Sequence, residues 1–276
     1  MNNYLAVLTI LIGIIIIVAI YTDNHHISRF FWTYTRQDYR SYYYAGNDSI
    51  VRMRSIFSEP AHLGHYLNTI FFANLFFNKS KKGYILIILM LGILLTFSYS
   101  MIFIFLITGF SYLLVNTIKG NIKWTKKVWY LVIPMTLILA MLWDIIYVTI
   151  IERTINILSG MDGSAYNRII ESWIYVENER LIFGNGIGHT PPITNIYAYV
   201  ISDFGLIGFI PYLGLTGYII LNSLTTGILF ITMNMAKGGY LNPSFWLFLL
   251  FVFLYGIIPS IKEKVNSNEL EGKIYV

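Results

Sequence analysis

The chain has 276 residues, of which 56% are hydrophobic and only 12% are charged, and its formal net charge is +5 at pH 7. Several apolar stretches approach the roughly 20 residues that a helix needs to cross a bilayer, so the composition excludes an ordinary soluble globular fold. Cysteine is absent, which excludes disulfides and thiolate metal sites. The lysines lie in short segments beside the apolar stretches, a pattern typical of membrane topology, and we expect no nucleic-acid binding.

The apolar stretches predict an all-α, polytopic integral membrane protein with about seven transmembrane helices. No internal repeat or low-complexity linker divides the sequence, so residues 1–276 are predicted to form a single integral membrane domain. The first stretch lacks a basic region before it and a small-residue cleavage site after it, which favours a retained helix over a signal peptide. The predicted spans are 4–21, 61–77, 84–98, 102–117, 128–148, 205–233 and 243–261.

A tight hairpin is predicted at "TFSYS", residues 96–100, because the apolar stretch around it is too long for one upright helix. The lysines lie at the other ends of the two helices that this hairpin joins. The tip of the hairpin is therefore expected on the side of the membrane opposite the lysines.

Arginine and lysine are segregated along the chain. All arginines fall in two long segments, residues 22–60 and 149–204, whereas the lysines occupy the short segments between spans, Lys237 among them, and the carboxy-terminal tail. The positive-inside rule is most reliable for short loops, so we place the lysine segments in the cytoplasm. Residues 22–60 then form a first external loop and residues 149–204 a second, large external loop. The amino terminus is inside, and an odd number of spans leaves the carboxy terminus outside, unless the last span is re-entrant or the sixth consists of two pieces.

The first external loop ends in the stretch "RMRSIFSEPAHLGHYL", which predicts a helix start at residues 58–60. It offers a capping serine, an acidic residue at the positive end of the helix dipole, and a proline that the first turn tolerates. Arg52 and Arg54 converge with Glu59 at the mouth of the span, where ionisable groups tend to mark a substrate path. His62 and His65 are three residues apart and share a helix face with Glu59; a His-x-x-His pair with one glutamate is only a weak zinc pattern, and we expect no metal. Capping and anchoring at the membrane interface are the structural alternative.

The second external loop contains "SAYNRIIESWIYVEN", residues 164–178, which predicts an interfacial helix with one apolar stripe. Arg168 and Glu171 flank this stripe, so the helix would present a cation to a lipid headgroup. Arginine suits that role because its planar fork grips phosphate oxygens in bidentate fashion. The stripe consists of Tyr166, Ile169, Ile170, Trp173 and Val176.

A glycine-rich turn, "GNGIG", follows at residues 184–188. Its spacing imitates a nucleotide fingerprint, but no βαβ pattern surrounds it and no lysine follows, so we expect the glycines to allow a tight turn or a close approach to a ligand. His189, Asn195 and Tyr197 then supply hydrogen-bonding and stacking groups before the sixth span. Such a surface is typical of sugar binding.

In this order and spacing, these motifs resemble the bacterial O-antigen polymerase and O-antigen ligase superfamily of membrane glycosyltransferases, from about Arg52 to Phe209. Two positions depart from the family pattern: Tyr99 stands where the hairpin usually has arginine, and Thr194 stands where ligases usually have histidine. The chain is also shorter than is usual for the family. The motifs that carry the resemblance are "RSIFSEPAHLGHYL", the "TFSYS" hairpin, Arg168 before Trp173, "GNGIG", "NIY" from Asn195 and "GLIG" from Gly205.

The resemblance implies polymerisation of lipid-linked repeat units into O-antigen, capsular or exopolysaccharide at the bacterial cytoplasmic (inner) membrane. An oligosaccharide would pass from undecaprenyl pyrophosphate to a hydroxyl of another lipid-linked unit, without metal or cofactor. Arg54 and Arg168 would stabilise charge on the departing pyrophosphate, and Glu59 or His189 would serve as general base. The partners implied are the lipid-linked oligosaccharide, membrane lipids, a chain-length regulator and a flippase. The substrate-binding candidates are Arg52, His62, Trp173, Asn195 and Tyr197.

Three alternatives remain at this point. An O-antigen ligase would use the same carrier, although Thr194 departs from its pattern. A transporter or flippase of lipid-linked sugars would need a continuous polar path, whereas Asp144 is the only charge deep in a predicted span. The short length also allows an amino-terminally truncated member that binds the carrier without turning it over.

Overall fold

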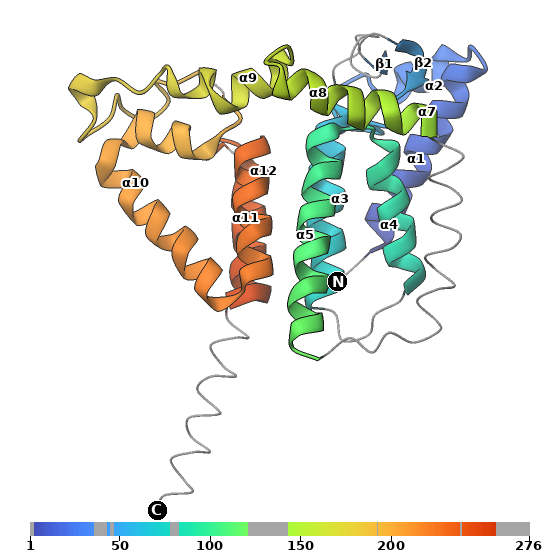
Figure 1. Cartoon of the computed structure of the whole chain (residues 1–276). Helices are drawn as coiled ribbons and strands as arrows, with labels where there is room; N and C mark the ends of the chain where they lie inside the picture. The colour runs from blue at the N-terminus through green and yellow to red at the C-terminus, as the bar shows by residue number, and fades with distance from the viewer. Residues whose placement is uncertain are drawn as a thin grey trace, which may run out of the picture. The chain divides into compact units, whose positions relative to one another are not determined.

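The predicted all-α architecture is confirmed by a computed structural model, in which most of the described residues are helical and the rest lie mainly in turns and loops (Figure 1). The strands among them form a two-stranded antiparallel sheet in the first loop, β1 (Tyr43–Tyr44) with β2 (Asn47–Val51). The chain forms two compact units, Met1–Asn74 with Ser80–Ala165 and Leu75–Lys79 with Tyr166–Val276. The structure describes residues 3–35, 43–44, 47–77, 83–120, 143–191, 193–237 and 239–257.

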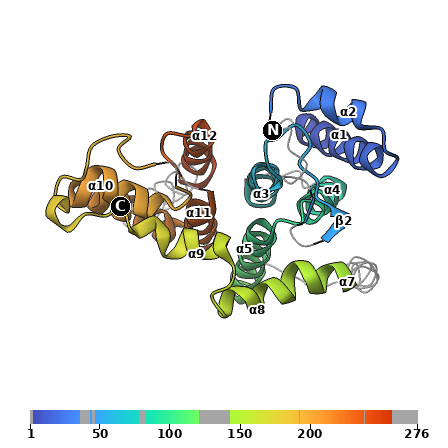
Figure 2. The same cartoon turned by 90° about the horizontal axis from the view of Figure 1, so that it is seen from above.

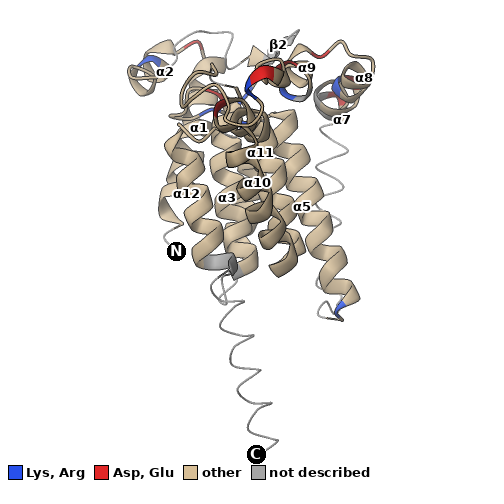
Figure 3. Ribbon diagram, turned by 90° about the vertical axis from the view of Figure 1, so that its left-hand side faces the viewer, with Lys and Arg blue, Asp and Glu red and all other residues tan. Residues whose placement is uncertain are grey.

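The first unit contains the first four predicted spans as helices with nearly the predicted bounds. Figure 2 shows α3, α4 and α5 as neighbouring helices, and Figure 3 shows almost no charged residue along α3 and α5. By length and composition, three helices among the described residues could cross a membrane: α1, α5 and, in the second unit, α10. The first unit contains α1 (Tyr4–Tyr21), the short α2 (His25–Phe31), α3 (Pro60–Phe77) as far as Asn74, α4 (Gly83–Leu95) and α5 (Tyr99–Ile118).

Small residues let these helices approach closely. A Cβ on Gly92 of α4 would lie 2.7 Å from Cδ1 of Ile10 in α1. In the same way, a Cβ on Gly64 of α3 would lie 2.7 Å from Cβ of Met101 in α5. Lipid tails are as apolar as leucine, so helices in a bilayer associate through such close packing and through hydrogen bonds. The bond from Asn68 Nδ2 to the Met101 carbonyl, 3.1 Å long, is one of these.

The predicted hairpin at residues 96–100 is confirmed. Helix α4 ends at Leu95, Phe97 adopts a positive φ of 41°, and α5 begins at Tyr99. The backbone N–H of Met53 donates to the Leu95 carbonyl at 2.9 Å, so the tip of the hairpin holds the segment that leads into α3.

The described part of the second loop begins with a continuous helical segment. It consists of α7 (Trp143–Ile146), a π-helix (Tyr147–Glu152) and α8 (Arg153–Leu158). Most of the predicted span 128–148 lies outside the described residues. Its predicted end falls within this helical segment, which continues to Leu158.

The single interfacial helix predicted over residues 164–178 is wrong. Helix α9 (Gly163–Ile169) ends early and is followed by 3₁₀ turns at Glu171–Trp173 and Asn178–Arg180. The physical reason is competition for backbone carbonyls. The carbonyl of Asn167 accepts from Ser172 Oγ at 2.7 Å, that of Arg168 from Asn195 Nδ2 at 3.2 Å, and that of Tyr175 from Ser202 Oγ at 2.7 Å.

The second unit is built on α10 (Ile196–Asn222), α11 (Leu224–Lys237) and α12 (Pro243–Phe251), which a π-helix (Val252–Ile257) continues. A single sixth span over 205–233 is therefore wrong, and the alternative of two pieces is confirmed, because the chain reverses at Ser223 and α11 packs back along α10 (Figure 1). The ring centroid of Tyr240, just after α11, lies 4.8 Å from that of Tyr199, near the start of α10. Lys237 thus lies at the end of this unit where α10 begins, and not at the opposite end as predicted.

Candidate functional site

In the first unit, Arg54 is built into the turn before α3. It is only 1% exposed, and its guanidinium carbon lies 3.7 Å from the centre of the Trp32 ring. Its Nη1 donates to the Ser58 carbonyl at 2.8 Å, and Trp32 Nε1 donates to the Ser55 carbonyl at 2.6 Å. Ser55 has a positive φ of 51°, and its hydroxyl donates to the Thr9 carbonyl at 2.7 Å. These contacts fix the helix entry that the sequence predicted.

The other site candidates of the first unit lie on either side of this turn, and all are partly exposed. Arg52 precedes it, with a long bond of 3.4 Å from its Nε to the Thr96 carbonyl of the hairpin. Glu59 directly precedes α3 and His62 lies in its first turn, where the backbone N–H of His62 donates to the Glu59 carbonyl at 3.1 Å. The structure thus brings the candidates of the first loop together at one helix start.

A further cation lies beside the hairpin, at the position where Tyr99 departs from the family pattern. The Tyr99 hydroxyl is 3.1 Å from Thr154 Oγ1, and the Arg153 guanidinium carbon lies 5.6 Å from the centre of the Tyr99 ring. Arg153 Nε also donates to Asp162 at 2.8 Å. Arg153 was not singled out from the sequence, because its neighbour Tyr99 is distant in the chain.

In the second unit, α10 is broken at Gly205, and residues 181–186, at the start of the glycine-rich turn, supply hydrogen-bond partners for the backbone groups at the break. Gly205 has φ 61° and ψ −161°, so the helical hydrogen bonds on either side of it are lost. Two amide groups beyond the break donate to residues 181 and 182: Leu206 to the Leu181 carbonyl at 2.8 Å, and Ile207 to that of Ile182 at 3.3 Å. Two carbonyls before the break accept from the glycine-rich segment: that of Ser202 from the Asn185 N–H at 2.9 Å, and that of Asp203 from the Gly186 N–H at 3.0 Å. A non-helical backbone is tolerated near a membrane only where such partners are present.

Two glycines make this crossing possible. A Cβ on Gly184 would lie 2.4 Å from the Asp203 carbonyl oxygen, and a Cβ on Gly205 would lie 2.4 Å from that of Ile182. The sequence predicted a tight turn or close approach to a ligand for the glycine-rich segment. The structure shows that Gly184 approaches another segment of the chain.

A buried carboxylate, which sequence reasoning missed, holds the same region. Asp203 is 1% exposed and accepts from the backbone N–H groups of Gly188 and Thr190 at 2.9 and 3.0 Å. The hydroxyls of Thr190 and Tyr240 also donate to it. Burial, and the hydrogen bond donated to Asp203, raise the pKa of the Tyr240 hydroxyl. The only signal in the sequence was a lone acidic residue at the entry to an apolar run.

The predicted site residues of the second unit divide into internal and exposed ones. Asn195 is 1% exposed, caps α10 by accepting from the Tyr197 N–H at 3.1 Å, and donates to the Arg168 carbonyl at 3.2 Å. Tyr197 is partly buried, with its ring centroid 5.4 Å from that of Tyr212. Trp173 and His189 are exposed, and Arg168 is partly exposed. The structure therefore joins Arg168 to Asn195 and leaves Trp173 and His189 at the surface.

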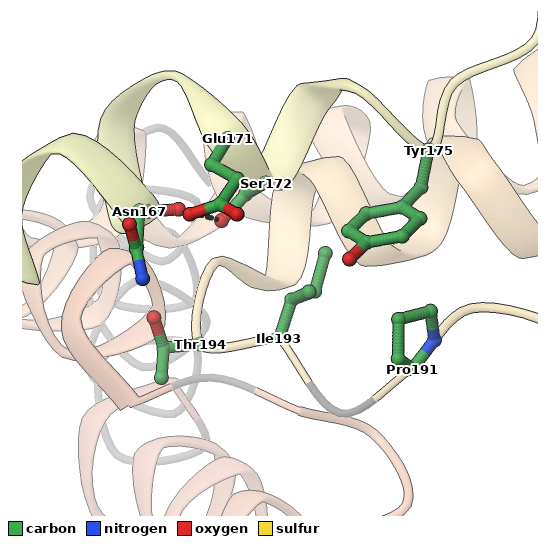
Figure 4. A pocket seen from close by; sticks show the side chains of 7 residues that line it. All are labelled: Asn167, Glu171, Ser172, Tyr175, Pro191, Ile193 and Thr194. Carbon is green, nitrogen blue, oxygen red and sulfur yellow. Dashed lines mark hydrogen bonds between the residues drawn. The ribbon is translucent and has the colours of Figure 1, made fainter.

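A pocket of about 240 Å³ opens between the end of α9 with the turn that follows it and the segment after the glycine-rich turn. The Glu171 carboxylate, the Asn167 amide and the Tyr175 hydroxyl point into the space over Ile193 (Figure 4). No group of three or more histidine and acidic side chains suited to a metal ion occurs among the described residues. The side chains that line the pocket can supply hydrogen bonding, stacking and proton transfer. One wall consists of Asn167, Glu171, Ser172 and Tyr175, and the other of Pro191, Ile193 and Thr194.

Comparison with known proteins identifies the family. Residues 2–220 match the family model described as WcaD colanic acid polymerase. No curated protein and no solved structure matches the chain. The match confirms the polymerase type of protein that the ordered motifs predicted, and it covers most of the 276 residues. The chain belongs to the WcaD colanic acid polymerase family.

Proposed function

We propose that this protein transfers a growing oligosaccharide from undecaprenyl pyrophosphate to a hydroxyl of the next lipid-linked repeat unit, at the outer face of the bacterial cytoplasmic membrane. The observation that carries the proposal is the polymerase family match over residues 2–220, which indicates polymerisation of polysaccharide repeat units by a membrane protein. The ligase, transporter and non-catalytic alternatives are not favoured by this family. The lipid carrier, the membrane face and the residue roles are the parts that we propose.

Arg168 is proposed to bind the pyrophosphate of the donor. Departure of the carrier develops negative charge on the phosphate oxygens, and a preorganised guanidinium stabilises that charge in a partly dry site. Two features support this role: the side chain is only partly exposed, and its backbone is tied to the buried Asn195 cap of α10. Loss of one such donor typically costs about 100-fold to 1,000-fold in rate.

The arginines of the first unit are proposed to have different roles. The Arg54 guanidinium is buried against Trp32, so we assign it to positioning the start of α3. Arg52 is partly exposed and precedes the same turn, so we assign it to a phosphate of the carrier. Glu59, directly before α3, and His62, in its first turn, would then face polar groups of the substrate. From the sequence alone, Glu59 or the exposed His189 was the expected proton acceptor.

The proposal is tested by reconstituting the protein in liposomes with undecaprenyl-pyrophosphate-linked repeat units from its host and resolving the product on a carbohydrate gel. Wild type should give a ladder, and Arg168→Ala should reduce its yield by about 100-fold or more. Arg180→Ala is the matched control, because Arg180 is 59% exposed and its ion-pair distance to Glu177 is 3.9 Å. An unchanged ladder from Arg168→Ala at normal abundance would refute the role of Arg168. No ladder from correctly inserted wild type would refute the function.

A further inference from the structure

We propose that the pocket over Ile193 binds one sugar ring of the acceptor repeat unit, and that Glu171, rather than Glu59 or His189, takes the proton from the acceptor hydroxyl. This inference rests on the proposed polymerase function. It assigns a second substrate subsite and a base that the sequence motifs did not indicate.

The size of the pocket selects a single ring. Its volume of about 240 Å³ lies below the roughly 300–1,000 Å³ of pockets that enclose drug-sized ligands. A whole repeat unit of several sugars would not fit. One ring can enter while the rest of the oligosaccharide extends through the open side.

The lining matches the surface of a sugar. A pyranose has apolar C–H faces and hydroxyl groups around its edge, so its site needs both flat apolar surfaces and hydrogen-bonding groups. Ile193 and the Tyr175 ring supply apolar surface, while Asn167 and Thr194 offer donors and acceptors and Glu171 offers acceptors.

Folding leaves the Glu171 carboxylate available. Among the described residues, no hydrogen bond or ion pair engages it, although neighbouring polar groups are used by the fold: Ser172 Oγ donates to the Asn167 carbonyl at 2.7 Å. The carboxylate is partly exposed and points into the pocket (Figure 4). An acceptor hydroxyl bound there could place its proton on this group.

The walls of the pocket are held before any ligand binds. Ser202 Oγ of α10 donates to the Tyr175 carbonyl at 2.7 Å, which anchors one wall. The other wall follows Thr190, whose N–H and hydroxyl both donate to the buried Asp203. A preformed site holds the reacting hydroxyl at little additional entropic cost.

The reaction balances as follows. The acceptor hydroxyl oxygen attacks the anomeric carbon of the lipid-linked donor and forms the new glycosidic bond. The bond from that carbon to the pyrophosphate oxygen breaks, and its electron pair leaves with undecaprenyl pyrophosphate. The hydroxyl proton passes to the Glu171 carboxylate and then to water.

The first test is Glu171→Gln in the liposome assay, with Glu179→Gln as control because Glu179 is exposed and does not line the pocket. Glu171→Gln should form glycosidic bonds at least about 100-fold more slowly, the usual contribution of a general base. It should still bind the lipid-free repeat-unit oligosaccharide within about threefold of wild type, because glutamine keeps the shape and an acceptor oxygen. A purely structural role would not separate rate from binding in this way.

The second test fills the pocket with Asn167→Trp, a change at an exposed side chain. It should weaken binding of the same oligosaccharide by about tenfold and raise the KM for the acceptor. If wild type makes polymer and Glu171→Gln does so at the rate of Glu179→Gln, the assignment of the base is refuted. Unchanged oligosaccharide binding in Asn167→Trp refutes the subsite. Absence of polymer from wild type instead refutes the proposed function itself.

Discussion

Replacing Gly205 with alanine should destabilise the second unit more than any conservative change elsewhere in α10. Its φ of 61° and ψ of −161° fall in a region that only glycine adopts readily. The added Cβ would also lie 2.4 Å from the Ile182 carbonyl oxygen and 2.5 Å from the Gly184 nitrogen. Both neighbours are backbone atoms, so they cannot move aside as a flexible side chain would.

The magnitude follows from these two effects. Holding alanine in this conformation costs about 2 kcal/mol. Relieving the clash moves residues 181–186 away from α10 and weakens the hydrogen bonds across the break, each with a net contribution of about 1 kcal/mol. If two of them are lost, the free energy of unfolding falls by about 4 kcal/mol in total. At roughly 2–4 °C per kcal/mol, the Tm should fall by about 8–16 °C.

The assay is thermal unfolding of the detergent-purified protein, followed by tryptophan fluorescence, with Gly214→Ala as control. Gly214 also lies in α10, its φ is not positive, and nothing lies within 4 Å of its added Cβ. That variant should keep the wild-type Tm or raise it slightly, since alanine favours helix over glycine by about 1 kcal/mol. Equal Tm values for the two variants would refute the argument that the crossing of Gly184 and Gly205 holds this unit together.

Three further predictions concern other parts of the chain. Tyr240→Phe removes a donor to a buried carboxylate and should cost about 2 kcal/mol. Because folding raises the pKa of Tyr240, its contribution to the stability of the folded protein is present below the ordinary pKa of about 10 and is lost as the pH rises further. The Tm of wild type should therefore fall more steeply above about pH 10 than that of the variant. Because the chain has no cysteine, Leu241→Cys and Leu224→Cys can be labelled individually with a membrane-impermeant maleimide; the two should react from opposite sides, and reaction from one side would contradict the reversal at the end of α10. Arg54→Lys keeps the charge but loses the planar stack at 3.7 Å, so thermal unfolding should show a loss of about 1–2 kcal/mol, whereas Arg52→Lys should change stability by less than about 0.5 kcal/mol.

The helices of the first unit could be predicted because their limits are local. An uninterrupted apolar stretch sets the length of α1, and the serine, glutamate and proline at residues 58–60 mark the start of α3. The same holds for α12, where Asn242 caps a helix that begins with Pro243. In each case the residues that decide the boundary lie within a few positions of it.

The reversal after α10 could not be placed in the same way. Residues 205–233 are apolar and uncharged on both sides of Ser223, so hydropathy does not distinguish one long span from a helical hairpin. The early end of α9 has a similar origin. The side chain that takes its Arg168 carbonyl, Asn195, caps a later helix, and Ser202, which takes the carbonyl of Tyr175 after α9, lies in that same helix.

The candidate site was predicted in part. Motifs in the sequence were enough to select Arg168 and Asn195 as site candidates. The hydrogen bond from the Asn195 side chain to the Arg168 carbonyl, however, depends on tertiary structure. Asp203 was missed because its partner Tyr240 lies 37 residues later, in a segment with no recognisable motif. Glu171 was noticed only as a flank of an amphipathic stripe, and its position in a pocket required the fold.

The hydrogen bonds across the break in α10 also imply an order of assembly. Residues 181–186 precede the break in the chain, so they are available as soon as residues 202–207 have been synthesised, and closing the short loop between them costs little entropy. The Tyr240 hydroxyl reaches Asp203 only after α11 has been made and has turned back along α10. We therefore expect the break to form early on the nascent chain, and the bond from Tyr240 to form later.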